Sequence, residues 1–238
     1  MSDEERANVW VVGASSGIGR AAALEFANVG ARVVVSARRA NELERLKRDL
    51  GERGEFVEAA PCNVASRKNV EQTALKRFGE SGLDCLVNAA GVTAFKTIEK
   101  TSVPEIEEIL TVNLFGAIYA IKAALPLMID RGGGTIVNIL SVAAKKILTQ
   151  SGAYSASKAG LHAFSKVLRE ETRKQNIRVV DILPGATDTP IWSDDMRERY
   201  ADRMMRPEDV ARVIVGAFLQ KGNMVSEEIT LRPEQGDL

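Results

Sequence analysis

Short apolar runs rich in β-branched residues alternate with longer helical patterns along this 238-residue chain, and no other feature restricts its fold as strongly. Several of the runs are apolar without alternation, which is typical of parallel strands covered on both faces. Strands that alternate with helices in this way predict an α/β fold, a parallel sheet with helices on both sides. The predicted strands are 9–12, 32–36, 55–60, 83–88, 135–140, 178–183 and 228–231.

Two of the predicted helices carry clear start signals. Ser102 with Glu105 forms a capping box, and Pro104 stands in the first turn. A later helix begins near Pro207, followed by two acidic residues that favour the positive end of the helix dipole. These signals support the alternation of helices and strands.

The helical segments 106–128 and 153–168 carry more apolar surface than their place against a sheet explains. Both are apolar or small on more faces than one sheet contact can bury. A second copy of the chain would cover the surplus, unless loops of the same chain do so. We expect a homo-oligomer, which the family resemblance described below narrows to a homodimer or a homotetramer.

Composition excludes several functional classes. Lys plus Arg and Asp plus Glu are equal at 32 each, which argues against a nucleic-acid groove and an anionic membrane surface. The first eight residues are acidic and polar, unlike a signal peptide. The longest apolar stretch, 116–129, contains Lys122 and Pro126 and is shorter than the roughly 20 residues of a membrane span. Without repeats or linkers, we expect one cytoplasmic domain over residues 1–238.

Cysteine and histidine usage argues against a metal site and a disulfide framework. Cys62 and Cys85 form no CxxC motif and have no neighbouring histidine. His162 is the only histidine and falls within a predicted helix. We therefore expect buried free thiols, a structural histidine and no metal.

The stretch WVVGASSGIGR at 10–20 permits two interpretations. It fits GxSxG, the elbow that presents a nucleophilic serine in hydrolases, with Ser15 as the nucleophile. That elbow follows several strands and needs a histidine base later in the chain, whereas Ser15 follows the first strand and His162 is helical. The hydrolase interpretation is therefore disfavoured.

The alternative interpretation is a glycine turn that binds a dinucleotide. Strand, turn, helix from about 17 to 29 and second strand follow within about 30 residues, as this motif requires. Gly13 permits the tight turn, Gly17 lets the backbone approach the phosphates, and Gly19 permits close packing of helix on strand. The sequence thus predicts a dinucleotide cofactor.

The end of the second strand indicates which dinucleotide binds. An acidic residue there would bind the ribose hydroxyls and favour NAD(H). This chain has Ala37 followed by Arg38 and Arg39, and guanidinium groups suit a 2′-phosphate. We expect NADP(H) rather than NAD(H), unless both arginines form only a solvated loop.

Tyr154 and Lys158 form a YxxxK pair on a predicted helix, where i and i+4 side chains share one face. A nearby ammonium can lower the pKa of a phenol enough for acid–base chemistry near neutral pH. Ser141 follows the strand 135–140, at the edge where α/β sheets bind ligands, and could donate to a carbonyl or merely cap a turn. Together the three side chains predict proton transfer to and from a carbonyl oxygen.

These residues belong to a longer series of motifs. In order along the chain they are GASSGIG at 13–19, NAAG at 88–91, NLFG at 113–116, Ser141, YSASK at 154–158 and PGATDT at 184–189. With them the chain resembles the short-chain dehydrogenase/reductase family over nearly its whole length. The resemblance implies a Rossmann-type, doubly wound, seven-stranded parallel sheet in the order 3-2-1-4-5-6-7.

The resemblance also implies catalytic roles for four residues. Asn113 would hold a water that links Lys158 to solvent, and Ser141 would polarise the carbonyl. Tyr154 would transfer the proton, and Lys158 would also bind the nicotinamide ribose. The cofactor-binding residues implied by the motifs are Gly13, Ser15, Ser16, Gly17, Ile18, Gly19, Arg38, Arg39, Asn63, Val64, Asn88, Ala89, Ala90, Gly91, Tyr154, Lys158, Pro184, Gly185, Thr187 and Thr189.

Three positions depart from the family pattern. Val12 replaces the usual threonine, which would loosen contact with the Asn88 loop. Asn63 replaces an aspartate, although its oxygen can still accept a bond from adenine. Leu140 replaces a frequent first serine, while Ser141 keeps the catalytic position.

The activity implied is the reversible, NADP(H)-dependent reduction of a ketone or aldehyde to an alcohol. The alternative is a non-catalytic protein of the same fold that senses NADP(H). Segment 190–206 is expected to form a lid over a small-molecule substrate, and the C-terminal segment resembles members acting on 3-hydroxy acids. The expected substrate contacts are Ser141, Tyr154, Ile147, Leu148, Trp192 and Met196.

Overall fold

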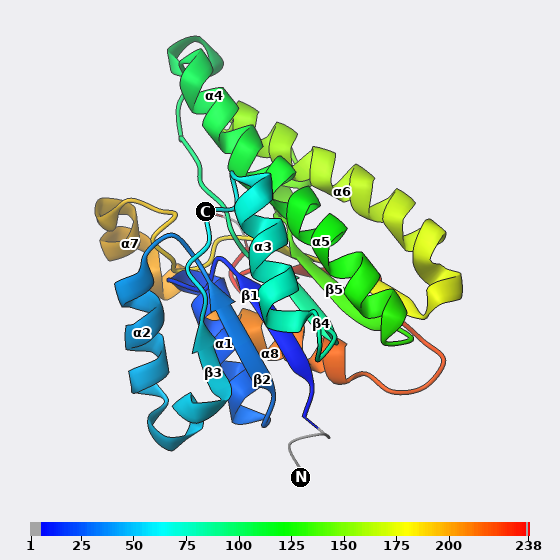
Figure 1. Cartoon of the computed structure of the whole chain (residues 1–238). Helices are drawn as coiled ribbons and strands as arrows, with labels where there is room; N and C mark the ends of the chain where they lie inside the picture. The colour runs from blue at the N-terminus through cyan, green and yellow to red at the C-terminus, as the bar shows by residue number, and fades with distance from the viewer. Residues whose placement is uncertain (1–5, 237) are drawn as a thin grey trace.

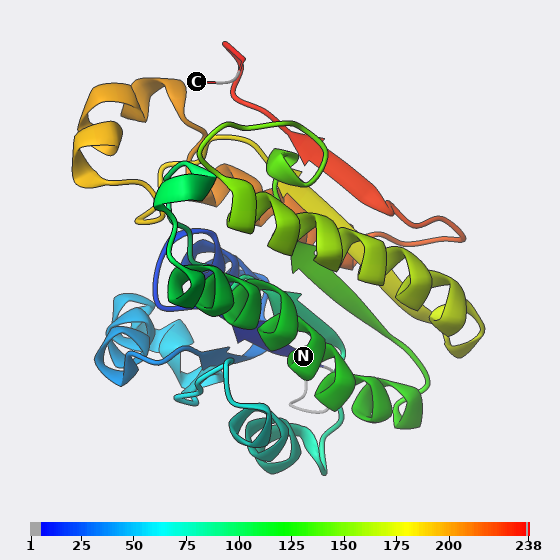
Figure 2. The same cartoon turned by 90° about the horizontal axis from the view of Figure 1, so that it is seen from above.

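The computed structural model describes residues 6–236 and 238 and shows seven parallel strands between two layers of helices (Figures 1 and 2). The strand order is β3-β2-β1-β4-β5-β6-β7, which confirms the predicted sheet. The strands are β1 Asn8–Val12, β2 Arg32–Ser36, β3 Val57–Ala59, β4 Cys85–Asn88, β5 Gly134–Ile139, β6 Ile177–Pro184 and β7 Glu228–Leu231.

Helices cover both faces of the sheet. They are α1 Gly17–Asn28, α2 Ala40–Asp49, α3 Arg67–Phe78, α4 Val103–Leu110, α5 Gly116–Asp130, α6 Gly152–Thr172, α7 Asp194–Tyr200 and α8 Pro207–Leu219. Helices α1, α2 and α8 contribute buried side chains to one apolar core, and α3, α5 and α6 to the other. The central strands are therefore buried on both faces, as their continuous apolar runs predicted.

Two predicted strands begin later than expected. Glu55 and Phe56 belong to a 3₁₀ helix, Gly51–Phe56, so β3 starts only at Val57. Asp84 precedes β4, and its carboxylate accepts a hydrogen bond from the Asn8 backbone amide at 2.7 Å. The 3₁₀ turn before β3 and the side-chain bond of Asp84 before β4 are not revealed by the apolar pattern alone.

The helical start signals are confirmed. Ser102 and Glu105 form a reciprocal capping box at α4, and Pro207 opens α8 with two acidic residues behind it. Helices α4 and α5 join through a π-helical turn, Thr111–Phe115, into one helical run from 103 to 130. By length and composition this 28-residue run could cross a membrane, whereas the apolar stretch 116–129 within it is shorter than a span. Its apolar character has another explanation in this fold, because Ala120, Ile121 and Ala124 are fully buried against the sheet layer.

Both cysteines are free and buried, as predicted. Within the described ranges 6–236 and 238, no cluster of three or more His, Cys, Asp or Glu side chains could hold a metal ion. His162 lies on the buried side of α6, with its ring against Glu228 of β7.

Candidate functional site

A cavity of about 910 Å³ lies at the carboxyl ends of the strands, where open α/β sheets bind ligands. Of the predicted catalytic residues, Ser141, Tyr154 and Lys158 line it and Asn113 does not. Ile147, Leu148 and Trp192 also line it, whereas Met196 does not. The predicted cofactor residues that line it are Gly13, Ser15, Ser16, Gly17, Ile18, Gly19, Arg38, Arg39, Asn63, Val64, Ala89, Ala90, Gly91, Tyr154, Lys158, Pro184, Gly185, Thr187 and Thr189.

The glycine turn after β1 has a backbone that other residues could not adopt. Gly13 has φ +90°, and a Cβ there would lie 2.4 Å from the Ala90 backbone nitrogen. A Cβ on Gly19 would lie 2.4 Å from the carbonyl oxygen of Gly13. Ser16 precedes α1 without a side-chain cap, so first-turn amides of this helix face the cavity uncapped. Uncapped amides at a helix N-terminus are a suitable site for a diphosphate.

The segment after β2 places two guanidinium groups beside this turn. Arg39 Nη2 donates to Ser15 Oγ at 2.9 Å and to Ser16 Oγ at 3.3 Å. Arg38 is exposed at the same wall of the cavity, and Ala37 leaves the end of β2 without a carboxylate. These residues fit a ribose that carries a phosphate.

Asn63 and Asn88 stand at two further strand ends. Asn63 Oδ1 accepts from the Ala65 backbone amide at 3.1 Å, which leaves one lone pair for another donor. Asn88 does not line the cavity, and its Nδ2 donates to Asn138 Oδ1 at 2.9 Å. Its buried Oδ1 has no partner among the described residues, and its neighbour in register on β1 is the apolar Val12.

Helix α6 carries Tyr154 and Lys158 on the face that meets the sheet. Lys158 is 4% exposed, and its Nζ donates to the Ile139 carbonyl at 2.7 Å. Burial lowers the pKa of Lys158 to about 8. The ammonium lies 5.8 Å from the centre of the Tyr154 ring.

The acid–base properties of Tyr154 differ from the prediction. Burial raises the pKa of the phenol, and a hydrogen bond with Ser141 lowers it in part. The predicted lowering of this pKa by the Lys158 ammonium is therefore wrong for this arrangement, because burial of the phenol has the larger effect. Ser141 also caps a short 3₁₀ turn, since its Oγ accepts from the Ala143 amide at 3.1 Å. The expected turn cap is confirmed, and donation to a substrate carbonyl stays a prediction.

Asn113 lies behind the cavity wall, within the π-helical turn. Its amide bonds to the backbone of Val92 in both directions, at 2.8 and 2.9 Å, and to Ser157 Oγ at 3.0 Å. A Cβ on Gly91 would lie 3.6 Å from Asn113 Oδ1 and 3.7 Å from Lys158 Nζ. The absence of that side chain leaves an open gap between the amide and the ammonium.

The glycine turn and the Ser141–Tyr154–Lys158 cluster thus line one cavity. A family model for short chain dehydrogenases matches residues 7–199. The chain belongs to the short-chain dehydrogenase family. It is therefore an oxidoreductase with the Rossmann-like fold described above.

Proteins similar to this short-chain dehydrogenase include some that are named as reductases or dehydrogenases. A sepiapterin reductase of Chlorobaculum tepidum is 35% identical, over 96% of both chains. An alcohol dehydrogenase from Thermococcus sibiricus, solved with 5-hydroxy-NADP, superposes with a TM-score of 0.86 at 26% identity, over 97% of both chains. A closed serine dehydrogenase with NADP⁺ gives a TM-score of 0.89 at 28% identity, over 97% of this chain and 96% of that one.

In this short-chain dehydrogenase, sequence reasoning missed Phe95 at the mouth of the cavity. Its ring stacks on that of Trp192, with 4.9 Å between centres and 15° between planes. Phe95 lies in a loop after β4, four residues beyond NAAG, and is 41% exposed. An exposed aromatic residue so close to a cofactor motif was the available signal. Ile147 is 98% exposed and contributes only to the rim.

Proposed function

We propose that this chain catalyses the reversible, NADP(H)-dependent reduction of a ketone or aldehyde to an alcohol. The observation that carries the proposal is the meeting of Ser141, Tyr154 and Lys158 in the wall of the cavity that also contains the glycine turn. The solved relatives that hold NADP or NADPH support the cofactor. The uncapped end of α1 and the pair Arg38 and Arg39 would hold its phosphates.

NADPH, when bound, supplies the hydride that the carbonyl carbon accepts. The Ser141 hydroxyl is hydrogen-bonded with that of Tyr154, and both would hold the carbonyl oxygen. Tyr154 then donates its proton to that oxygen as negative charge develops there. Its raised pKa keeps the phenol protonated at neutral pH, which is the state that a proton donor needs.

Lys158 would restore the proton that Tyr154 gives up. Its pKa of about 8 lies near the working pH, so the amine can exchange protons readily. Asn113 and the open side of Gly91 are adjacent to Lys158 Nζ, in support of a water there. Such a water would connect the buried lysine with solvent.

The mouth of the cavity favours a flat, uncharged ring over a small acid. Phe95 and Trp192 present two parallel aromatic faces. Among the described lining residues, Lys158 is the one cation near this end, because Arg38 and Arg39 lie at the glycine turn. A 3-hydroxy acid would find no guanidinium for its carboxylate. We infer a cyclic carbonyl compound of the sepiapterin type, the substrate named for the relative of Chlorobaculum tepidum.

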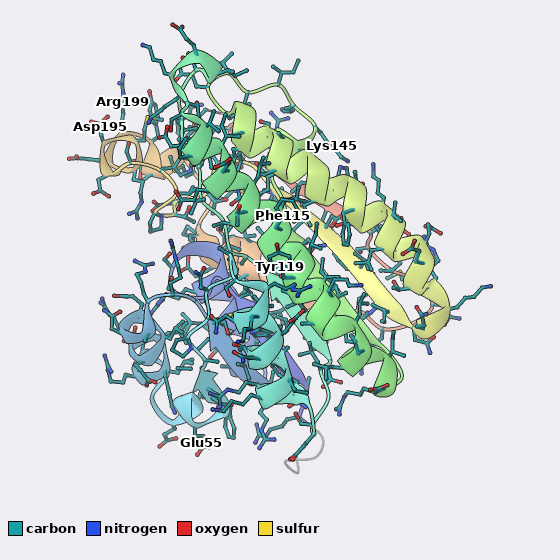
Figure 3. The ribbon with its side chains drawn as sticks, turned by 45° about the horizontal axis from the view of Figure 1, so that its top comes forward. Glu55, Phe115, Tyr119, Lys145, Asp195 and Arg199 are labelled. Carbon is teal, nitrogen blue, oxygen red and sulfur yellow. The ribbon has the colours of Figure 1, made fainter. Side chains whose placement is uncertain are left out.

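The remaining expectations form part of the same proposal. Residues 1–238 form one catalytic domain in the cytoplasm, and segment 190–206, with Trp192, closes over the substrate. A second copy covers α5 and α6. Phe115, which ends the π-helical turn before α5, is 46% exposed and stacks at 6.3 Å on Tyr119 of α5 (Figure 3). Sedimentation of the purified protein tests the last point, with a dimer or tetramer expected.

Loss of NADPH absorbance in the presence of candidate substrates tests the function. Sepiapterin and cyclic diketones should be reduced, and 3-oxo acids of similar size should be poor substrates. Phe95→Ala should raise KM for sepiapterin roughly ten-fold, the value of a stacked aromatic contact, with little change in NADPH affinity. NADPH binding without reduction of any carbonyl would instead favour the non-catalytic sensor.

A further inference from the structure

Helix α6 presents a continuous row of polar side chains to the sheet. Tyr154, Lys158, His162, Ser165 and Arg169 recur three or four residues apart, so they lie on one helix face. All five side chains are buried or nearly so. The first two belong to the proposed reaction, and the other three have no role in it.

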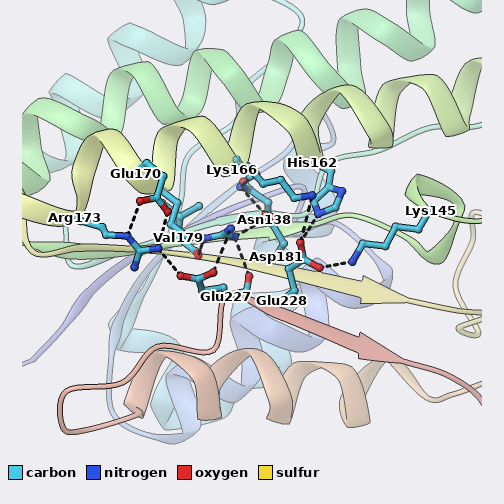
Figure 4. A network of polar contacts seen from close by, with 12 residues as sticks. Asn138, Lys145, His162, Lys166, Glu170, Arg173, Val179, Asp181, Glu227 and Glu228 are labelled. Atoms are coloured by element: carbon cyan, nitrogen blue, oxygen red, sulfur yellow. Dashed lines mark hydrogen bonds and ion pairs between the residues drawn. The ribbon is translucent and has the colours of Figure 1, made fainter.

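The sheet also carries a row of polar side chains. In register across the strands, Asn88 of β4 lies opposite Asn138 of β5, which lies opposite Asp181 of β6 and then Glu228 of β7. Asn138 Nδ2 donates to Ser165 Oγ at 2.8 Å. Figure 4 shows these contacts between helix and sheet. Such hydrogen bonds fix the position of α6 along the strands.

Glu228 differs from the rest of the row because it also contacts a second segment. Its carboxylate accepts from His162 Nε2 at 2.6 Å and from Lys145, with Lys166 at 3.9 Å (Figure 4). Lys145 directly follows the 3₁₀ turn that Ser141 caps. His162 follows Tyr154 by two turns of α6. One carboxylate therefore joins the segment of Ser141 to the helix of Tyr154.

We propose that Glu228 is a positioning residue, which holds Ser141 against Tyr154 by binding Lys145 and His162 together. This inference rests on the proposed function, because it concerns the same proton transfer. The Glu228 side chain is 26% exposed, and such ion pairs contribute about 0–1 kcal/mol to folding stability. Its effect should therefore appear in reaction geometry and not in stability. The pKa of Glu228 is lowered to about 2, so the carboxylate stays charged at any working pH.

The test compares Glu228→Gln with a matched control. Glu227→Gln makes the same change one residue earlier, where the carboxylate pairs with Arg173 at 2.7 Å near the far end of α6. We expect E228Q to lower kcat roughly ten- to a hundred-fold, with unchanged Kd for NADPH and unchanged unfolding midpoint. E227Q should keep the kcat of the unmodified protein. Equal kcat for E228Q, E227Q and the unmodified protein would overturn the proposal.

Variants of Lys145 test the second half of the contact without disturbing a buried group. Lys145→Met should reproduce the loss of kcat seen in E228Q, and Lys145→Arg should restore it. The double variant E228Q with K145M should lose no more than either single variant, because both break the same link. Additive losses would show that the two side chains act separately. This series also decides the matter if E228Q fails to fold.

Titration of Tyr154 gives a readout that does not depend on turnover. Tyrosinate absorbance, taken as the difference from the Tyr154→Phe form of each variant, isolates this phenol from the other two tyrosines. Loss of the Ser141 hydrogen bond in E228Q should move the titration to higher pH, whereas mere loss of a nearby negative charge would move it lower. An unmoved or lowered titration overturns the positioning role. A protein that reduces no carbonyl overturns the proposed function alone.

Discussion

Lys158 Nζ donates to the Ile139 carbonyl over 2.7 Å, and this bond ties the helix of Tyr154 to the strand that ends beside Ser141. The lysine is nearly inaccessible, and apolar surroundings disfavour its charged form. A buried ammonium at this place costs stability and provides acid–base function. This trade-off leads to the first prediction.

Stability should depend on pH through Lys158. Its pKa is about 8 when folded and ordinarily 10.5, so between these values the unfolded chain binds the extra proton. Stability therefore rises with pH over this window, by about 3 kcal/mol for a shift of this size. Urea unfolding at several pH values, with Lys158→Met as reference, measures the contribution. A difference between the two proteins that stays constant from pH 7 to about 10.5 would contradict it.

Ser141→Ala should change the pH profile as well as the rate. The Ser141 hydrogen bond lowers the pKa of Tyr154 against the larger effect of burial, so its removal raises that pKa further. In alcohol oxidation the phenolate is the base, and its pH limb should move to higher pH while kcat falls roughly 10²- to 10⁴-fold. The pH dependence of kcat/KM for oxidation records both changes. If kcat falls but the pH limb does not move, Ser141 contacts the substrate and does not change the pKa of Tyr154.

Arg38→Ala and Arg39→Ala should each weaken NADPH binding. A charge-assisted bond to the 2′-phosphate contributes about 1.5–3 kcal/mol, or roughly ten- to a hundred-fold in affinity. NADH lacks that phosphate, so its Kd should not change. Calorimetric titration with both dinucleotides measures the two effects. Equal losses for NADPH and NADH would mean that Arg39 acts on the glycine turn through Ser15 and Ser16.

The sequence predicted the sheet and most of the cavity wall for a physical reason. Parallel strands end at one edge, so motifs placed after strands must meet there. Phe95 was missed because it lies in a loop, where no hydrophobic period relates it to the predicted contact Trp192. The sequence did not predict the partners of Glu228, because these partners depend on the register of β7 and on which face of α6 meets it.

The pKa of Tyr154 was predicted in the wrong direction for a related reason. Spacing shows that Lys158 shares a helix face with Tyr154, but not that its ammonium binds the Ile139 carbonyl. Burial of the phenol is likewise a property of the assembled fold. Predicting pKa shifts of this kind requires atomic coordinates, whereas the order of the motifs can be read from the sequence.

The buried ion pair between Arg169 and Asp181 should contribute strongly to the free energy of unfolding. Arg169 Nη2 lies 3.1 Å from Asp181 Oδ2, with Asp181 fully buried. Arg169→Met leaves that carboxylate without its cation and should cost about 3–5 kcal/mol. Urea unfolding measures the loss, and adding Asp181→Leu should recover part of it. If the double variant recovers none of the lost stability, the other polar side chains of the row, and not the ion pair, determine the loss.

The most direct test of the proposed chemistry is single-turnover oxidation of bound NADPH by sepiapterin in Tyr154→Phe. This variant keeps the ring that packs beside Lys158 and removes only the proton donor. We predict unchanged NADPH affinity and a rate lowered roughly 10³-fold or more. A rate close to that of the unmodified protein would contradict the account, because some other group would then protonate the carbonyl oxygen.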